Sequence, residues 1–169
     1  MTTEGEVDAP PAVPPSSPSV DARARARAEH DRVLAAGDHL IQQMAFRDVS
    51  DTGGDLTIEL DLDARLTNPR GGLQGGLMAT MADVVAGRAV FNGSPAGSAC
   101  VTSDLTIHYL AALTVGPARA RATVVQRGRS RAVANVDIID VGTGRVSAVC
   151  TVAFSVFPGD AQAGGILET

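Results

Sequence analysis

Apolar and polar residues alternate strictly between Gly54 and Asp63. Leucine or isoleucine occupies every second position, and aspartate, threonine or glutamate fills the positions between. A period of two predicts a β-strand with one buried face and one solvated face.

Four further strand-like segments follow later in the chain, separated by short turns that contain glycine. They span residues 100–109, 118–126, 131–140 and 145–157. Consecutive strands joined by such short turns predict an antiparallel meander.

The stretch NPRGGLQGGLMATMADVVAGRAV, residues 68–90, lies between the first strand and the meander. Its second half is rich in helix-forming residues, with apolar side chains on every face: Leu77, Met78, Met81, Val84, Val85, Ala89 and Val90. A helix that is apolar all round is expected to be buried. The pattern therefore predicts an α+β fold in which an antiparallel sheet wraps around one central helix.

The remaining segments complete the predicted organisation of the chain. Residues 1–20 are rich in proline and serine and are expected to be disordered. Asp21 is expected to cap an arginine-rich, solvated helix over residues 21–40. A single domain is predicted over residues 41–158, followed by a mobile tail over residues 159–169.

Composition excludes several classes of function. The net charge of −5 and the aromatic content of 3% argue against nucleic acid as a partner. The N-terminus lacks the apolar core of a secretory signal, and no apolar run is long enough to span a bilayer. We therefore expect a cytoplasmic protein without a membrane partner. Cys100 and Cys150 show no metal-binding spacing and are expected to be reduced and buried, so no metal or cofactor is predicted.

Asp83 stands alone in the predicted helix. The residues three and four positions away are alanine, threonine and glycine, so no cation on the same helix can pair with it. A buried carboxylate without a partner costs stability unless another part of the fold contacts it. Two interpretations stay open: a carboxylate satisfied by the backbone or by Thr80, or a general base or nucleophile.

Two glycine pairs, Gly71-Gly72 and Gly75-Gly76, lead into this helix. Backbone N–H groups at a helix N-terminus stabilise an anion or a developing oxyanion. A phosphate-binding loop would end in Gly-Lys-Ser/Thr, whereas Leu77 and Met78 follow here. A dinucleotide site would need parallel βαβ units, which the meander excludes. Close packing of the helix against the sheet remains the structural alternative.

The residues NPRGGLQGGLMATMADVVAG resemble the signature of hotdog-fold acyl-CoA thioesterases of the phenylacetate-pathway (PaaI) type. That pattern runs from Asn through His-Gly-Gly to an Asp within the helix. The resemblance continues through TSDLTIHYLAAL, QRGRS and the final strand, over residues 41–157. It implies a hotdog fold and an enzyme that hydrolyses acyl-CoA thioesters to the free acid and coenzyme A.

The resemblance also implies roles for individual residues. Asp83 matches the catalytic acid, acting as nucleophile or general base. Gly75 matches the glycine whose N–H polarises the thioester carbonyl, and Asn68 the residue that orients the water or the carbonyl. Thr102 matches a Ser or Thr that reaches the site from the partner subunit.

Coenzyme A binding and assembly follow from the same resemblance. Its phosphates are expected at the turn formed by Gly128, Arg129 and Ser130, and Gly76 is expected among the binding residues. Because the sites of this family lie between subunits, the resemblance implies a homodimer or a dimer of dimers.

One residue departs from the family pattern, because Gln74 occupies the position of the histidine. Glutamine forms hydrogen bonds but does not titrate. Activity should survive if this position only orients the loop, whereas a need for an imidazole would leave a non-catalytic acyl-CoA-binding or sensor protein. A hotdog hydratase ranks lower, because no Asp–His pair is identified. The sequence does not indicate which acyl group is bound.

Overall fold

The computed structural model describes residues 20–50 and 53–157 and divides into two units, Met1–Gln43 and Met44–Thr169. The first unit contains helix α1 (Val20–Ala35) and the short helix α2 (Leu40–Gln43). Helix α1 begins at Val20, so Asp21 lies within its first turn and the predicted N-cap is wrong. Gly37, with φ of 73°, separates the two helices. The predicted tails over residues 1–20 and 159–169 lie outside the described residues, apart from Val20.

The second unit carries the predicted sheet and central helix. Its elements are β1 (Arg47–Asp48), β2 (Leu56–Leu60), the 3-10 helix η1 (Ala64–Leu66), α3 (Gly75–Asn92), β3 (Ala99–Tyr109), β4 (Ala118–Arg127), β5 (Arg131–Asp140) and β6 (Arg145–Phe157). The pattern predicted β2, α3 and the four later strands, whereas β1 and η1 are too short to show a period. In the described part of the chain, no helix is long and apolar enough to cross a membrane.

The strand order differs from a simple meander. The sheet is antiparallel with the order β1-β2-β4-β5-β6-β3. Strands β4, β5 and β6 are neighbours in sequence and in space, as predicted, but β3 pairs with β6 at the edge of the sheet. The physical reason is that β2 already occupies the hydrogen-bonding edge of β4. The connection over residues 110–117 therefore carries the chain past the ends of the other strands.

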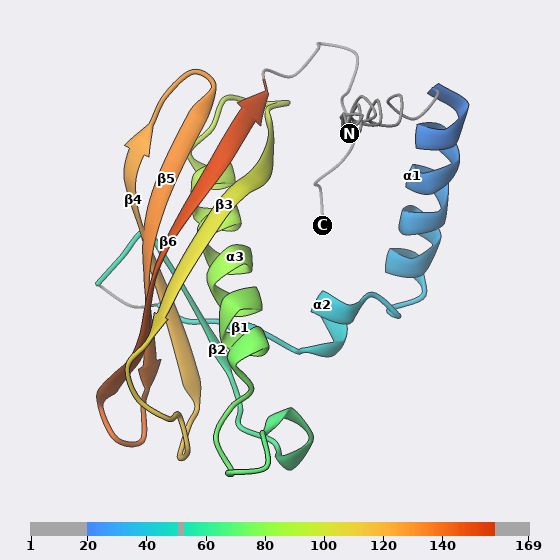
Figure 1. Ribbon diagram of the computed structural model, residues 1–169. Helices are drawn as coiled ribbons and strands as arrows, with labels where there is room; N and C mark the ends of the chain where they lie inside the picture. The colour runs from blue at the N-terminus through green and yellow to red at the C-terminus, as the bar shows by residue number, and fades with distance from the viewer. Residues whose placement is uncertain (1–19, 51–52, 158–169) are drawn as a thin grey trace, which may run out of the picture. The chain divides into compact units, whose positions relative to one another are not determined.

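Helix α3 packs on one face of this sheet (Figure 1). Alternate residues of β4 and β5 on that face are small, chiefly alanine, which leaves space for the larger side chains of the helix. The buried helix residues are Met78, Met81, Ala82, Val85, Ala86, Ala89 and Val90. The prediction that α3 is buried on every face is therefore wrong, because the sheet covers one side and leaves a flank that includes Asp83 and Val84 partly exposed.

The outer face of β2 also differs from the predicted solvated face. Thr57 and Glu59 are both buried, and Glu59 is only 6% exposed. Arg119 on β4 donates to Glu59 at 2.7 and 2.8 Å, and Arg47 on β1 lies 3.4 Å from it. These arginine stems cover the carboxylate and neutralise its charge, which makes its burial tolerable.

A buried carboxylate holds the connection between β3 and β4 in place. Asp140, at the end of β5, is 1% exposed and accepts backbone N–H groups from Thr114, Val115 and Gly116 at 2.9–3.2 Å. Burial by itself raises the pKa of the Asp140 carboxyl, but the backbone donors outweigh it, so the net pKa is below its usual value. Asp140 thereby satisfies three consecutive N–H groups of this loop.

Replacement of Asp140 by Asn should destabilise the domain. The substitution removes the negative charge and places an amide NH2 against N–H donors, so we expect a loss of about 2 kcal/mol. Urea unfolding monitored by circular dichroism measures this loss. Asp137→Asn on the same strand is the control, since Asp137 forms a partly exposed pair with Arg121 and should cost less than about 1 kcal/mol.

The stability difference between the wild type and Asp140→Asn should depend on pH. Because the folded pKa is lowered, the carboxylate contributes its full stability above the unfolded pKa of about 3.9, and loses it as pH falls through the folded pKa. The difference should therefore be constant near neutral pH and narrow below about pH 4. A difference that stays unchanged at low pH would contradict a stabilising role for the charge.

Candidate functional site

The N-terminus of α3 presents backbone donors that have no acceptor in the described chain. Gln74 is the N-cap, and no side-chain hydrogen bond caps the helix. The N–H groups of Leu77 and Met78 both donate to the Gln74 carbonyl, whereas those of Gly75 and Gly76 have no acceptor among the described residues. Such free donors lie at the positive end of the helix dipole, where negative charge is stabilised.

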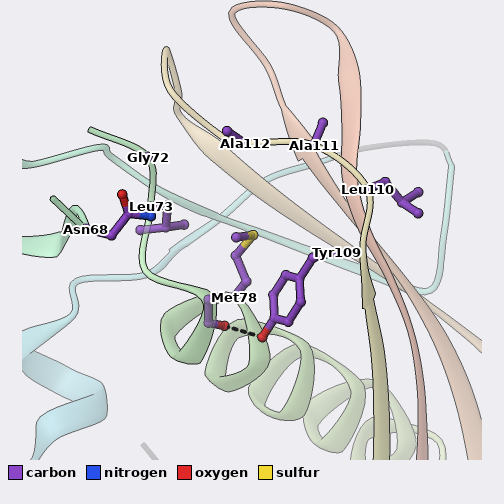
Figure 2. Close-up of a pocket in the computed structure, with 9 residues that line it drawn as sticks. Asn68, Gly72, Leu73, Met78, Tyr109, Leu110, Ala111 and Ala112 are labelled. Atoms are coloured by element: carbon purple, nitrogen blue, oxygen red, sulfur yellow. Dashed lines mark hydrogen bonds between the residues drawn. The ribbon is translucent and has the colours of Figure 1, made fainter. Parts of the chain in front are cut away.

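A pocket of about 450 Å³ opens beside this helix end (Figure 2). Its walls are mainly apolar and come from α3, from the loop before it and from the end of β3 with the connection that follows. The lining residues are Asn68, Gly72, Leu73, Gly75, Met78, Tyr109, Leu110, Ala111 and Ala112. The pocket thus combines an apolar volume with the polar end of a helix, as binding sites for small molecules commonly do.

The loop before α3 is held in a defined turn. The Asn68 side-chain oxygen accepts the N–H of Arg70 at 2.8 Å, and the Asn68 backbone N–H donates to Gly72 O at 2.8 Å. Gly71 adopts a φ of 79°, a conformation that favours glycine. Because the Asn68 oxygen is occupied by this turn, its amide nitrogen is the group left to face a ligand. The structure thus brings two of the predicted residues, Asn68 and Gly75, into one pocket.

Tyr109 is a site residue that sequence reasoning did not identify. Its hydroxyl donates to the Gly75 carbonyl at 2.8 Å, as the dashed line in Figure 2 shows. Burial raises the pKa of the Tyr109 phenol, followed by a smaller effect of Cys150. The alternation of residues along this strand places Tyr109 on the same face as Leu105 and Ile107. No sequence motif indicated a role for its hydroxyl group.

The hydrogen-bond partner of Asp83 lies on β3. Thr102 donates its hydroxyl to an Asp83 carboxylate oxygen at 2.6 Å. Both residues belong to one chain, and whether they reach the Gly75 end of a partner subunit stays a prediction. Thr80 does not satisfy the carboxylate, because its hydroxyl donates to the Gly76 carbonyl at 3.0 Å. Arg88 does not satisfy it either, since it forms a bidentate pair with Asp48 at 2.6 and 2.7 Å.

Cys100 also lies close to this carboxylate. Burial raises the pKa of the Cys100 thiol, and the negative charge of Asp83 raises it further. The Cys100 thiol contacts the Gly87 carbonyl at 3.8 Å. Both cysteines are free; Cys150 is buried as predicted, whereas Cys100 is partly exposed.

Within one chain the predicted site residues fall into separate places. Gly75 and Asp83 are about 12 Å apart along the helix axis at 1.5 Å per residue. Asp83 and Thr102 do not line the pocket that Gly75 lines. The predicted phosphate-binding turn, residues 128–130, is exposed and lies near the other end of α3, where Arg127 donates to the Ala89 carbonyl at 3.0 Å. Helix α3 thus separates the three groups from one another.

No metal centre is visible in the described residues: no group of three or more histidine, cysteine, aspartate or glutamate side chains lies close enough to hold an ion. The predicted site residues supply backbone donors, an amide, a carboxylate and hydroxyl groups.

Residues 71–152 match a sequence model described as the thioesterase superfamily. Among the curated proteins, no sequence matches the chain significantly. The family match covers α3 and most of the strands that follow it, and it includes Gly75, Asp83 and Thr102.

Solved structures share the fold. A thioesterase of Haemophilus influenzae is 20% identical, with a TM-score of 0.67 over 76% of this chain and 89% of its own. A mutant thioesterase of Pseudomonas aeruginosa is 22% identical, with a TM-score of 0.66 over 76% of this chain and 93% of its own. A Bacillus halodurans protein crystallised with CoA is 25% identical, with a TM-score of 0.64 over 84% of this chain and 94% of its own. These likenesses confirm the predicted hotdog fold.

Replacing each glycine at the start of α3 should distinguish a packed position from an open one. A Cβ on Gly75 would lie 3.2–3.3 Å from the Tyr109 ring and hydroxyl, whereas a Cβ on Gly76 would meet nothing within 4 Å. Gly75→Ala should therefore displace the ring and change the near-ultraviolet circular dichroism of the single tyrosine. Gly76→Ala should leave that spectrum unchanged. Identical spectra for both variants would contradict the packing described here.

Proposed function

Because residues 71–152 of the hotdog domain match the thioesterase superfamily, we propose that the protein hydrolyses acyl-CoA thioesters. The observation that carries the proposal is the pair of N–H groups at Gly75 and Gly76 that have no acceptor among the described residues, beside an apolar pocket that Gly75 lines. The acyl chain would occupy the pocket, and the thioester oxygen would accept a hydrogen bond from the Gly75 N–H. Asn68, through its amide nitrogen, would orient the carbonyl or the attacking water.

Asp83 would supply the attacking group or activate it. As general base it takes a proton from water, whose oxygen then bonds to the carbonyl carbon; as nucleophile its own oxygen forms that bond. In both cases the negative charge that develops on the carbonyl oxygen is stabilised at the helix N-terminus. The C–S bond then breaks, and coenzyme A leaves as a thiolate that is protonated afterwards. If Asp83 is the nucleophile, the acyl group is left on Asp83 as an anhydride, which water hydrolyses to release the acid and the carboxylate. Thr102 holds the carboxylate in position through its 2.6 Å hydrogen bond.

The two catalytic groups would come from two copies of the chain. The donor nitrogen and the attacking oxygen each lie about 3 Å from the thioester carbonyl, so these two atoms are roughly 7 Å apart. If a water molecule lies between the carbonyl and the base, the distance from the donor to the base is about 10 Å. Both lengths fall short of the approximately 12 Å that separates Gly75 from Asp83 on one helix. Two antiparallel helices would place Gly75 of one copy opposite Asp83 of the other.

Strand β3 offers the edge through which two copies would associate. It is the last strand of the sheet, it is long, and the described residues leave its outer edge unpaired. Val101 and Tyr109 on this strand are 58% and 51% exposed. An unpaired edge of this length normally pairs with another strand or is protected. A two-fold axis at β3 would also bring the exposed flank of α3, with Asp83, towards the second copy.

The coenzyme A portion is proposed to lie along the turn formed by Gly128, Arg129 and Ser130. All three residues are exposed, and Arg129 supplies a positive charge suited to a phosphate. The CoA present in the Bacillus halodurans structure supports this class of ligand. Because the turn lies far from Gly75 on the same chain, it too would serve a site completed by a second copy.

Asp83→Asn should abolish thiol release while the protein stays folded. Asparagine keeps an oxygen to accept the Thr102 hydroxyl, but it cannot act as base or nucleophile, so we expect at least a 100-fold loss, about the lower end for general-base catalysis. Release of CoA from short, long and aryl acyl-CoA esters, measured with a thiol reagent, tests this. Asp137→Asn is the control and should keep full activity. Comparable turnover by Asp83→Asn would refute the assignment.

Mixing two inactive variants should restore activity if the site is shared. Gly75→Pro removes the proposed donor at the first helical position, where proline is accepted, and Gln74 already has the extended ψ of 131° that precedes proline. In a co-folded mixture of Gly75→Pro and Asp83→Asn, half of the dimers are mixed and each has one intact site. About a quarter of the wild-type sites should therefore return. No recovery in dimers whose mixing is verified by mass spectrometry would indicate a site within one chain.

A non-catalytic acyl-CoA-binding protein is the second candidate, and Gln74 favours it. The Gln74 side chain is exposed at the N-terminus of α3 and makes no capping hydrogen bond. A glutamine cannot transfer a proton to a leaving group. Saturable binding of acyl-CoA esters without thiol release would support this candidate over hydrolysis.

A further inference from the structure

Tyr109 contacts the helix end at the peptide that carries the Gly76 N–H, directly after the peptide that carries the proposed Gly75 donor. Its hydroxyl donates to the carbonyl of Gly75, and its ring occupies the space that a side chain at position 75 would need. In Figure 2 the ring stands next to the first turn of α3, with Met78 beside it. Tyr109 is the last residue of β3, so the register between β3 and β6 decides where the phenol is placed.

The carbonyl of Gly75 and the N–H of Gly76 belong to one planar peptide group and point in opposite directions. A hydrogen bond on this carbonyl therefore restricts the direction of the Gly76 N–H, which has no acceptor in the described chain. It also polarises the peptide, and such cooperative effects strengthen a neighbouring hydrogen bond by about 10–30%. Flexible glycines would otherwise leave these donors poorly oriented.

The Tyr109 ring also forms the aromatic part of the pocket wall. The other lining side chains are aliphatic, apart from the Asn68 amide and the Met78 thioether. The ring is anchored at its hydroxyl end and is 51% exposed, so it lies between the pocket and the surface. Its position limits the width of the pocket at the helix end, where an acyl group would enter.

We propose that Tyr109 is a positioning and specificity-determining residue: its hydroxyl orients the Gly75–Gly76 peptide, so that the Gly76 N–H acts as a second donor beside the Gly75 N–H, and its ring sets the width of the acyl pocket. This inference rests on the proposed hydrolysis. The hydroxyl would affect turnover, and the ring would affect the preference among acyl groups, so the two effects can be measured separately.

Tyr109→Phe tests the hydroxyl, because it keeps the ring. We expect kcat for acyl-CoA hydrolysis to fall about 3- to 10-fold, the usual worth of one hydrogen bond, with KM and the order of preferred substrates unchanged. Thr151→Val is the matched control, since it removes one hydroxyl that bonds to Asn135 on the exposed side of β6. Its kcat should equal that of the wild type. An unchanged kcat in Tyr109→Phe would overturn the role of the hydroxyl.

Tyr109→Leu tests the ring. A narrower, flexible side chain should widen the pocket and shift the preferred substrate towards bulkier acyl groups, measured as ratios of kcat/KM across a series of acyl-CoA esters. Comparison with Tyr109→Phe separates this shift from the loss of the hydroxyl. Equal ratios in the wild type, Tyr109→Phe and Tyr109→Leu would overturn the role of the ring. A melting curve for each variant identifies any loss that comes from unfolding.

The tyrosine fluorescence of the protein distinguishes two possible errors. One is that Tyr109 does not lie at the site, and the other is that the protein does not hydrolyse acyl-CoA. The chain has one tyrosine and no tryptophan, so its tyrosine emission reports Tyr109 alone. An S-alkyl pantetheine thioether cannot be hydrolysed and lacks the adenine absorbance of CoA, and it should change this emission saturably. A saturable change without thiol release from acyl-CoA would refute hydrolysis but keep Tyr109 at the site. Thiol release without any change in emission would refute the placement of Tyr109.

Discussion

The packing of one side of α3 against small residues of the sheet is the constraint on which the rest of this structure depends. Alanines on β4 and β5 admit Met81 and Val85 of the helix, and this apolar contact fixes the rotation of the helix about its axis. Once the rotation is fixed, Asp83 must lie on the uncovered flank, facing β3. The glycine end of the helix is likewise held over the pocket. The core therefore decides where the polar groups can act.

Buried and partly buried carboxylates in this domain are satisfied in different ways. Glu59 is paired with arginines, Asp140 accepts backbone N–H groups, and Asp83 has one donor in the described part of the chain, the Thr102 hydroxyl. The first two arrangements neutralise or distribute the charge and serve stability. A single neutral donor leaves most of the Asp83 acceptor capacity unused, which suits a group that must still take a proton or form a bond.

Sequence reasoning identified much of the site because the helix period is local. The isolation of Asp83 follows from its neighbours three and four residues away, and the free N–H groups of Gly75 and Gly76 follow from their place at the helix start. Tyr109 could not be identified in this way, because its contact with Gly75 joins residues that are far apart in the sequence and depends on strand register. The position of β3 beside β6 was missed for the same reason, since strand order depends on which edges are already occupied.

One repeated peptide separates what the sequence determines from what tertiary structure decides. Ala-Arg-Ala-Arg-Ala occurs at residues 22–26, within α1, and again at residues 118–122, within β4. The local pattern permits both conformations, because alanine and arginine favour a helix while strict alternation suits a strand. In β4 the peptide is hydrogen-bonded to β2 and β5, and its alanines are buried. Its two arginines form salt bridges with Glu59 and Asp137. The sequence alone determined the central helix, its lone carboxylate and its glycine start. The tertiary structure decided the conformation of the repeated peptide, because only long-range pairing supplies hydrogen bonds and burial on both sides of a strand.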